Sequence, residues 1–227
     1  MSNLLFDPIK TQSSVTDSVI VAFSGGKDSV VTLDLCFRYF KNVQPFFMYL
    51  VPDLEFQEQM LRKYERKYNT EIMRLPHFEL SNFLKYGSFT LPDHTVDIVK
   101  IQDIYAYVRE ETGFYWISAG ERCADSIVRN AMIKKSGSID KKRGRFFPLA
   151  YWKKNDVLQY IKYRKLYLSS EQKKLGFSFR SLAGSELAVI KELYPDDYRK
   201  ILRVFPDAGA AVEHYNLFEK EADNGKK

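Results

Sequence analysis

The chain has 227 residues, of which 45% are hydrophobic and 28% charged, and its formal net charge is +6 at pH 7. This length is sufficient for one sizeable core and a smaller appendage. The cysteines Cys36 and Cys123 are far apart and belong to no Cys-x-x-Cys pair, which argues against a disulfide framework, a structural zinc site or an iron–sulfur cluster held by this chain alone. No stretch approaches the roughly 18 apolar residues of a membrane span, and we expect a soluble, cytoplasmic protein.

The hydrophobic pattern of the first part of the chain predicts alternating strands and helices. Apolar strands are expected at residues 19–23, 45–51 and 71–75, and amphipathic helices lie between them, the second at residues 54–68. Right-handed crossovers convert this βαβαβ order into an open, mainly parallel sheet with helices on both faces. We therefore expect a Rossmann-like α/β fold.

The rest of the chain is predicted to add one strand and several helices. These elements are, in order, a loop at 76–94, a helix at 97–111, a strand at 114–118, a helix at 122–135, a helix that begins with Asn155 as its N-cap, and two or three helices from about residue 181 that Pro195 and Pro206 interrupt. We expect a nucleotide-binding domain at residues 1–180 and a helical C-terminal extension, residues 181–227, packed on it.

The stretch VIVAFSGGKDSVV, residues 19–31, places a glycine turn between a strand and a helix. Such a turn is typical of phosphate binding, because glycines let backbone N–H groups approach phosphate oxygens and the helix dipole is positive there. The spacing matches neither the Walker P-loop nor the dinucleotide fingerprint. Lys27 supplies a charge, whereas Asp28 is suited to capping the helix or binding magnesium. The predicted phosphate-binding residues are Ser24, Gly25, Gly26, Lys27, Asp28 and Ser29.

The sequence Ser-Gly-Gly-Lys-Asp-Ser between strand and helix is the signature of the PP-loop ATP pyrophosphatase superfamily. Within it the chain resembles the phosphoadenylylsulfate (PAPS) reductase family, which includes the PP-loop subunit of ATP sulfurylase. The resemblance continues through PFFMYLVPDLEFQEQ, ISAGERCADSIVRN and FFPLAYWKKNDVLQYI, over about residues 17–180. It implies an adenine nucleotide alpha hydrolase-like fold that binds ATP and Mg²⁺.

Gly120, Arg122 and Arg129 are the candidates for acting on the α-phosphate, and they resemble the family's Gly-x-Arg…Arg block. Gly120 lets the backbone turn at the end of a sheet strand, where doubly wound folds bind ligands. The two arginines are expected about two turns apart on one face of the predicted helix, within reach of phosphate oxygens. The alternative is that they are solvated or paired with neighbours such as Asp125.

The chain departs from the family pattern in two ways. The reductases need a nucleophilic cysteine near the C-terminus, but the last cysteine here is Cys123, so reduction by their thiol mechanism looks disabled. We interpret Cys36 and Cys123 as packed, apolar residues. Val51-Pro52-Asp53 stands where the family has Asp-Thr-Gly. Asp53 is therefore a second candidate metal ligand, in addition to Asp28.

A basic cluster follows the predicted helix at 122–135. It is either a solvated loop or a second polyanion site that closes over the nucleotide or binds nucleic acid. Its residues are Lys134, Lys135, Lys141, Lys142, Arg143 and Arg145.

The favoured interpretation is an enzyme that binds ATP with magnesium and acts at the α-phosphate, releasing pyrophosphate by adenylyl transfer or by ATP hydrolysis. Three alternatives stay open: a sulfonucleotide reductase that borrows a thiol, an ATP-dependent enzyme for sulfur incorporation into nucleic acid, and a non-catalytic nucleotide- or nucleic-acid-binding module. The acceptor and any partner subunit are not specified by the sequence.

Overall fold

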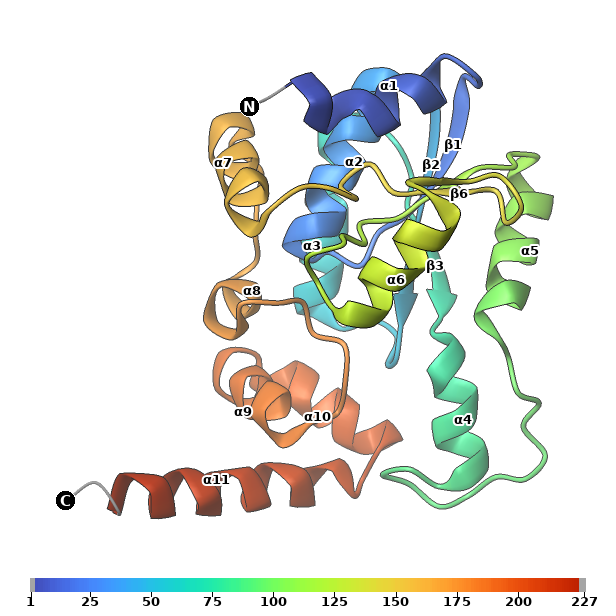
Figure 1. Ribbon diagram of the computed structural model, residues 1–227. Coiled ribbons are helices and arrows are strands. Elements are labelled where there is room, and N and C mark those ends of the chain that lie inside the picture. Colours follow the sequence, from blue (N-terminus) through green and yellow to red (C-terminus); the bar gives the residue numbers. More distant parts are fainter. Residues whose placement is uncertain (1–2, 225–227) are drawn as a thin grey trace. The chain divides into compact units, whose positions relative to one another are not determined.

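The computed structural model describes residues 3–224, and these residues contain a six-stranded sheet with helices on both faces (Figure 1). The strand order is β3-β2-β1-β4-β6-β5. β1 pairs in parallel with β2 and β4, and β4 pairs in parallel with β6, whereas β5 is an antiparallel edge strand. The predicted α/β class and open, mainly parallel sheet are therefore confirmed.

The elements alternate in the predicted order over the first part of the chain. The strands are β1 (Ser18–Ala22), β2 (Asn42–Tyr49), β3 (Met73–Pro76), β4 (Ile117–Ser118), β5 (Ile139–Asp140) and β6 (Arg145–Phe146). The helices are a 3₁₀ turn at Asn3–Phe6, α1 (Asp7–Ser13), α2 (Lys27–Tyr39), α3 (Glu55–Tyr68), α4 (Phe78–Tyr86), α5 (Ile101–Thr112), α6 (Ile127–Ser136), α7 (Lys154–Arg164), α8 (Ser170–Leu175), α9 (Gly184–Leu193), α10 (Pro195–Val204) and α11 (Ala208–Asn224). None of the helices within residues 3–224 is both long and apolar enough to cross a membrane.

The chain divides into two compact units. The first comprises residues 1–48, 61–75 and 102–168 and contains nearly all of the sheet; the second comprises residues 49–60, 76–101 and 169–227 and contains α4 and α8–α11. A helical C-terminal region is confirmed, since three helices follow residue 181 and Pro195 begins α10. The division at 180/181 stays a prediction, while the compact second unit also draws on two earlier segments of the chain.

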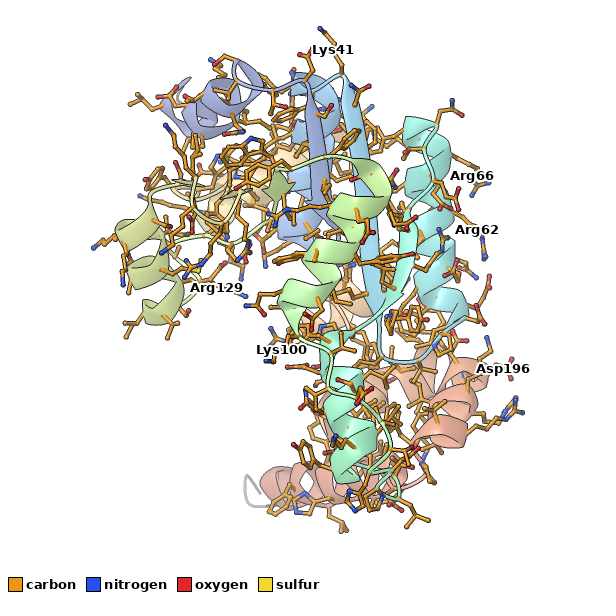
Figure 2. The ribbon with its side chains drawn as sticks, turned by 90° about the vertical axis from the view of Figure 1, so that its right-hand side faces the viewer. Lys41, Arg62, Arg66, Lys100, Arg129 and Asp196 are labelled. Carbon is orange, nitrogen blue, oxygen red and sulfur yellow. The ribbon has the colours of Figure 1, made fainter. Side chains whose placement is uncertain are left out.

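In the first unit, the sheet is buried between helices. Val19, Ile20 and Val21 of β1 are fully buried, which explains why this strand is continuously apolar. α2 and α3 cover one face of the sheet and α5 covers the other (Figures 1 and 2). Cys36 of α2 is fully buried, as its interpretation as a packed residue predicts, and burial raises the pKa of its thiol to about 12.

A buried carboxylate ties α2 to two other helices of this unit. Asp34 is fully buried and accepts hydrogen bonds from the hydroxyls of Tyr68 in α3 (2.6 Å) and Tyr160 in α7 (2.7 Å), and from Nε of Arg164 (3.0 Å). Burial alone raises the pKa of Asp34, but the hydrogen bonds from Arg164, Tyr68 and Tyr160 outweigh it, and the pKa lies below its ordinary value. The ionised carboxylate thus fixes the helix that begins at the glycine turn.

The second unit has a hydrophobic cluster of its own. Leu54 and Phe56 pack with Leu187, Ile201 and Phe205. The carboxylate of Asp197 accepts a hydrogen bond from the backbone N–H of Phe56 (2.9 Å) and so satisfies one of the open donors at the start of α3.

The predicted loop at residues 76–94 is wrong, because it contains α4. His77 caps this helix by accepting a hydrogen bond from the backbone N–H of Glu79 (3.2 Å), and Gly87 ends it with a left-handed φ of 72°. Leu80, Phe83 and Leu84 pack against the cluster of the second unit. Their i, i+3, i+4 spacing is the helical signal, which the flanking proline and histidine obscured.

Two predicted helix starts are also displaced. α5 begins at Ile101 instead of residue 97, and α7 is capped by Lys153 instead of Asn155. At α7, the carboxylate of Asp156 accepts a hydrogen bond from the backbone N–H of Lys153 (2.7 Å). This reverse cap, from the third helical residue, determines where the helix begins.

Asp34→Ala is expected to lower the free energy of unfolding by about 3 kcal/mol, because it leaves buried donors of the first unit without an acceptor. Urea denaturation measures the loss. The matched control is Asp17→Ala, which removes an exposed ion pair with Lys41 and is expected to change stability by less than about 1 kcal/mol. Equal losses in both variants would contradict the assigned role of Asp34.

The contribution of Asp34 is also expected to depend on pH. Because its native pKa lies below the unfolded value near about 4, its stabilising effect is complete above that pH and declines as the pH falls through the native pKa. The stability difference between the native sequence and Asp34→Asn should shrink on acidification below about pH 4. Urea titrations across this range test the sign, and a difference that grows on acidification would be inconsistent with it.

Candidate functional site

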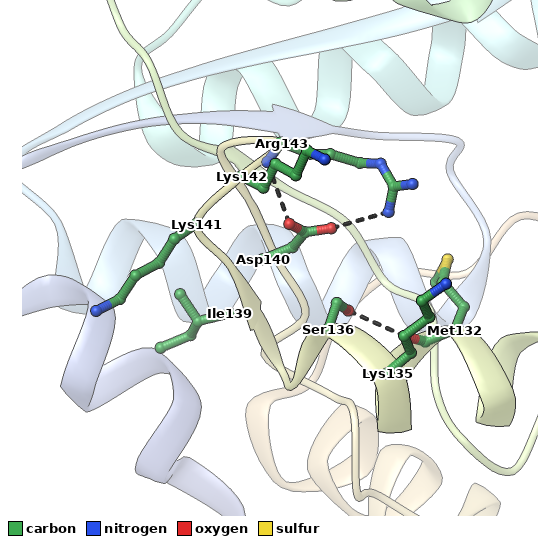
Figure 3. A pocket seen from close by; sticks show the side chains of 8 residues that line it. All are labelled: Met132, Lys135, Ser136, Ile139, Asp140, Lys141, Lys142 and Arg143. Carbon is green, nitrogen blue, oxygen red and sulfur yellow. Dashed lines mark hydrogen bonds and ion pairs between the residues drawn. The ribbon is translucent and has the colours of Figure 1, made fainter.

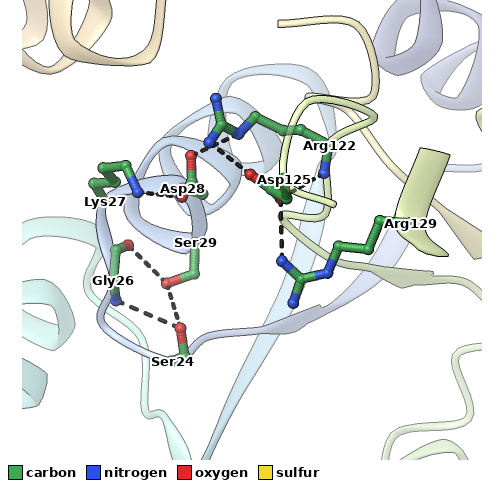
Figure 4. A network of polar contacts seen from close by, with 8 residues as sticks. All are labelled: Ser24, Gly26, Lys27, Asp28, Ser29, Arg122, Asp125 and Arg129. Carbon is green, nitrogen blue, oxygen red and sulfur yellow. Dashed lines mark hydrogen bonds and ion pairs between the residues drawn. The ribbon is translucent and has the colours of Figure 1, made fainter. Parts of the chain in front are cut away.

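The candidate site lies where β1 and β4 end. β1 leads into the glycine turn, and α2 begins within that turn, at Lys27. β4 leads into Ala119 and Gly120. Because the two strands are parallel neighbours, with Val21 opposite Ser118, both turns emerge at the same edge of the sheet (Figure 4). This is the edge where open α/β sheets bind ligands.

The glycine turn, residues Ser24–Ser29, is closed by its own hydroxyls. Ser29 Oγ donates to the carbonyl oxygen of Gly26 (2.9 Å), and Ser24 Oγ donates to Ser29 Oγ (3.2 Å). Gly25 has a left-handed φ of 73°, which residues with a Cβ rarely adopt. These contacts shape the turn, and its second half, from Lys27, is the N-terminal end of α2, where the first N–H groups lack intrahelical acceptors.

Gly120 allows the second turn to lie directly against the first. A Cβ at this position would lie 3.0 Å from the backbone carbon of Asp28 and 3.1 Å from the backbone nitrogen of Ser29. Any side chain at residue 120 would have to push the start of α2 away. The glycine is required here for close approach of two backbones.

The charged side chains of the two turns form one continuous series of ion pairs (Figure 4). Lys27 Nζ lies 2.9 Å from Asp28 Oδ2, Arg122 Nε lies 3.0 Å from Asp28 Oδ1, Arg122 Nη2 lies 2.6 Å from Asp125 Oδ1, and Arg129 Nη1 lies 3.2 Å from Asp125 Oδ2. Three cations face two carboxylates, which leaves a formal charge of +1. Asp28 and Asp125 therefore neutralise most of the positive charge that a phosphate would meet.

Arg122 is the buried member of this series. Only 5% of the residue is exposed, and its Nη1 is buried without a hydrogen-bond partner among the described residues. A buried, charged donor that is left unsatisfied is costly. An acceptor supplied by a ligand would satisfy it.

The expected placement of Arg122 and Arg129 on one helix face is wrong. α6 begins at Ile127, and Ser126 caps it by accepting a hydrogen bond from the backbone N–H of Arg129 (3.2 Å). Arg122 therefore lies in the turn before the helix, while Arg129 lies on its first turn and is half exposed (Figure 2). The two guanidinium groups meet through Asp125, which also accepts a hydrogen bond from the backbone N–H of Arg122 (3.0 Å). The pairing of the arginines with Asp125, which was the alternative interpretation, is thus present, and Arg122 also pairs with Asp28.

A second ion pair beside the site could not be predicted from the sequence. Arg145 Nη2 lies 2.7 Å from Glu121 Oε1, and the guanidinium lies over the rings of Tyr105 and Phe147. Burial lowers the pKa of Arg145, but the charge of Glu121 outweighs it, and the pKa lies above its ordinary value. No local signal links residues 24 positions apart, so the pair follows only from the β4–β6 neighbourhood.

The basic cluster is divided by the structure. Four of its six residues line a hollow at the β5–β6 turn, whereas Arg145 is held by Glu121 and Lys134 is not among the lining residues (Figure 3). The four are Lys135, Lys141, Lys142 and Arg143. Arg145 therefore belongs to the surroundings of the glycine turn instead of to the basic hollow.

The two candidate metal ligands differ in their surroundings. Both oxygens of Asp28 face cations of the site. Asp53 lies in the second unit with a left-handed φ of 56°, the conformation that suits the glycine of the family's Asp-Thr-Gly, and its backbone carbonyl accepts a hydrogen bond from Lys200 (2.6 Å). Within residues 3–224, no group of three or more His, Cys, Asp or Glu residues is placed to hold a metal. The assignment of Asp28 or Asp53 as a metal ligand stays a prediction.

The comparison with protein families is decisive for the family. Residues 18–170 match the family model described as "Phosphoadenosine phosphosulfate reductase domain". This is well over half of the chain, and the chain belongs to this family, as the sequence motifs predict.

Two curated relatives are uncharacterized proteins of Methanocaldococcus jannaschii. MJ0973 is 24% identical over 203 residues and MJ0066 is 26% identical over 231 residues, which cover 85% and 92% of this chain. The matches cover 48% and 45% of those proteins, so the chain spans about half the length of the curated relatives it matches.

Solved structures align with this chain at low sequence identity. An NH₃-dependent NAD synthetase from Campylobacter jejuni aligns with a TM-score of 0.50 at 16% identity, over 93% of this chain and 91% of its own. A PAPS reductase from Candida auris aligns with a TM-score of 0.49 at 18% identity, over 76% and 85%, and a U34-tRNA thiolase from Methanococcus maripaludis with 0.49 at 18%, over 89% and 78%. Together with the mainly parallel sheet, the alignment with the NAD synthetase gives the fold as that of the adenine nucleotide alpha hydrolase-like proteins.

Gly120→Ala is expected to destabilise the chain by about 1–3 kcal/mol, because the added methyl group overlaps the backbone at Asp28 and Ser29. Chemical denaturation measures the effect. The matched control is Gly209→Ala in α11, where an added Cβ meets no atom closer than 3.7 Å and is expected to be neutral or stabilising. If both variants unfold at the same denaturant concentration as the native sequence, the close approach has no energetic weight.

Proposed function

We propose that the chain binds ATP and catalyses attack on its α-phosphate with release of pyrophosphate, either in adenylyl transfer or in hydrolysis. The observation that carries this proposal is the contact between the buried Arg122 and Asp28 of the glycine turn. It brings a guanidinium with an unsatisfied N–H to the phosphate-binding turn of a protein from the PAPS reductase family. A cation at this position is suited to the α-phosphate when the turn holds the two terminal phosphates.

Each group of the site has a role in this proposal. The glycine turn Ser24–Ser29 holds the β- and γ-phosphates with backbone N–H groups, hydroxyls and Lys27. Arg122 and Arg129 bind the oxygens of the α-phosphate, and Gly120 keeps the two turns in contact. Fixed donors of this kind stabilise the charge that develops during phosphoryl-group chemistry without having to reorganise.

The reaction itself needs no covalent bond to the protein. An acceptor oxygen, or water, forms a bond to the α-phosphorus; the bond from that phosphorus to the oxygen bridging to the β-phosphate breaks; and pyrophosphate leaves with the bond electrons. The acceptor's proton passes to solvent. Positioning and electrostatics then supply the catalysis. In this proposal magnesium accompanies ATP as part of the substrate.

Asp28 and Asp125 are the counter-charges of the site within the chain itself. In the structure they occupy Lys27, Arg122 and Arg129, the same cations that the proposal assigns to phosphate. An ATP phosphate that enters must compete with them, and its several negative charges favour that exchange. The carboxylates then hold the guanidinium groups in orientation from behind.

A sulfonucleotide reductase with a borrowed thiol is the second candidate, and the family match favours it. The chain's own thiols offer little support. Cys36 is fully buried, and Cys123 packs beside the small cluster of Ala119, Ile133 and Phe147. A thiol for this reaction would therefore come from Cys123, which is only partly buried, or from another protein.

The nucleotide preference separates these candidates. Isothermal titration with ATP–Mg and with PAPS is expected to show tighter binding of ATP, and Lys27→Ala is expected to weaken that binding about 10-fold or more, since it removes a charge-assisted hydrogen bond to phosphate. Lys154→Ala, an exposed lysine at the start of α7, is the control and should bind as the native sequence does. With a suitable acceptor, pyrophosphate release should follow the same order.

Other outcomes would remove the proposal. Tight binding of PAPS without binding of ATP, with thiol-dependent sulfite release, would assign the chain to the reductases, and loss of that release in Cys123→Ser would identify the thiol. Binding of ATP without pyrophosphate release from any acceptor or from water would leave a nucleotide-binding module.

A further inference from the structure

A basic hollow lies at the β5–β6 turn, within the first unit and apart from the glycine turn (Figure 3). Its volume is about 590 Å³, within the roughly 300–1,000 Å³ of ligand sites. It is lined by Met132, Lys135, Ser136, Ile139, Asp140 and the turn residues 141–143. We use the name basic hollow for this set of residues.

The charge of the basic hollow is strongly one-sided. Lys135, Lys141, Lys142 and Arg143 are all exposed, and the one carboxylate in the lining, Asp140, is already paired with Arg143 at 3.1 Å. Four cations against one carboxylate give a formal charge of +3. Within residues 3–224 the three lysines have no ion-pair partner. This concentration of positive charge favours a ligand with several negative charges.

The turn that carries these cations is held in place. Arg109 of α5 donates hydrogen bonds to the carbonyl oxygens of Arg143 (2.7 Å), Gly144 (3.3 Å) and Tyr115 (2.8 Å). Asp140 accepts a second hydrogen bond from the backbone N–H of Arg143 (3.1 Å). A solvated loop needs no such support. A fixed turn keeps its charges in place and so loses less entropy when a ligand binds.

The lining also offers apolar surface. Met132 and Ile139 contribute to it directly, and the ring of Tyr115, which is 52% exposed, lies next to the turn with its hydroxyl 3.4 Å from the carbonyl oxygen of Lys141. Inorganic phosphate has no apolar group that could pack on this surface. Nucleic-acid strands combine phosphates with base faces that stack on aromatic and apolar side chains.

The basic hollow is connected to the candidate site by one helix. Arg129 lies in the first turn of α6 and Lys135 in its last turn. Six residues of α-helix correspond to about 9 Å along the axis. A strand whose phosphates lie in the basic hollow therefore needs only a few nucleotides to reach Arg129 and the glycine turn.

We propose that the basic hollow binds the sugar–phosphate backbone of a nucleic-acid strand. The binding is independent of ATP; the further step, that this strand is the acceptor of the reaction, rests on the proposed function. The phosphodiester groups are common to RNA and DNA, whereas the 2′-hydroxyl is present only in RNA, so the experiment compares both.

The test is fluorescence anisotropy with labelled single-stranded RNA and DNA oligonucleotides at several salt concentrations. Lys141→Glu/Lys142→Glu is expected to weaken binding at least 10-fold at low salt. The plot of log affinity against log salt concentration, which has a negative slope, should become less steep by about 0.7 for each phosphate that the variant no longer neutralises. The matched control is Lys154→Glu/Lys162→Glu, which makes the same charge change on exposed residues of α7 and should bind as the native chain does. Tighter binding of RNA than of DNA would identify the 2′-hydroxyl as part of the recognition.

The same variants separate this proposal from the proposed function. Lys141→Glu/Lys142→Glu should keep the native affinity for ATP, and Lys27→Ala should keep the native affinity for the oligonucleotide. Failure of ATP binding alone overturns the proposed function and leaves the nucleic-acid site standing. No oligonucleotide binding at low salt, equal weakening by the control pair, or binding of pyrophosphate but not of oligonucleotides in the basic hollow would overturn the nucleic-acid assignment.

Discussion

The candidate site depends on the ion pair between Arg122 and Asp28, which joins two turns that are almost a hundred residues apart in sequence. A buried guanidinium is costly when it is unpaired, and here Asp28 contacts its Nε while Asp125 contacts its Nη2. The backbone contact at Gly120 makes the pairing geometrically available, because it lets the turn after β4 lie against the start of α2. Charge and backbone sterics therefore enforce the same arrangement.

The rest of the first unit supports this arrangement from a distance. Asp34 holds the far part of α2 through Tyr68, Tyr160 and Arg164, so the helix that carries Asp28 is anchored on α3 and α7. Glu121, next to Arg122, is held in turn by Arg145 on β6. Each turn of the site is therefore supported by a further polar contact: that of Asp34 in α2 for the first turn, and that of Glu121 with Arg145 for the second. Preorganisation of this kind is what electrostatic catalysis requires.

The sequence was informative where the signal is local. Apolar runs predicted the strands on both sides of the glycine turn, and Pro195 and Pro206 marked the C-terminal helices, because proline and continuous hydrophobicity act within a few residues. Prediction from the sequence failed where a tertiary contact or a capping contact determines the structure. Ser126 and Asp125 determine the start of α6, which a helical pattern from residue 122 did not indicate, and the partner of Arg145 lies 24 positions away. The sequence motif identified the glycine turn and the two arginines. The ion pairs through Asp28 and Asp125 that connect them follow only from the three-dimensional structure.

The pairing of the site's cations with carboxylates of the same chain has a consequence for folding. A phosphate site whose cations faced one another without counter-charges would repel itself, and such a chain would need its ligand in order to fold. Here the carboxylates of Asp28 and Asp125 complete the charge balance in advance. The charge balance of this cluster is therefore supplied by the chain's own residues, and its stability does not depend on an anion from outside.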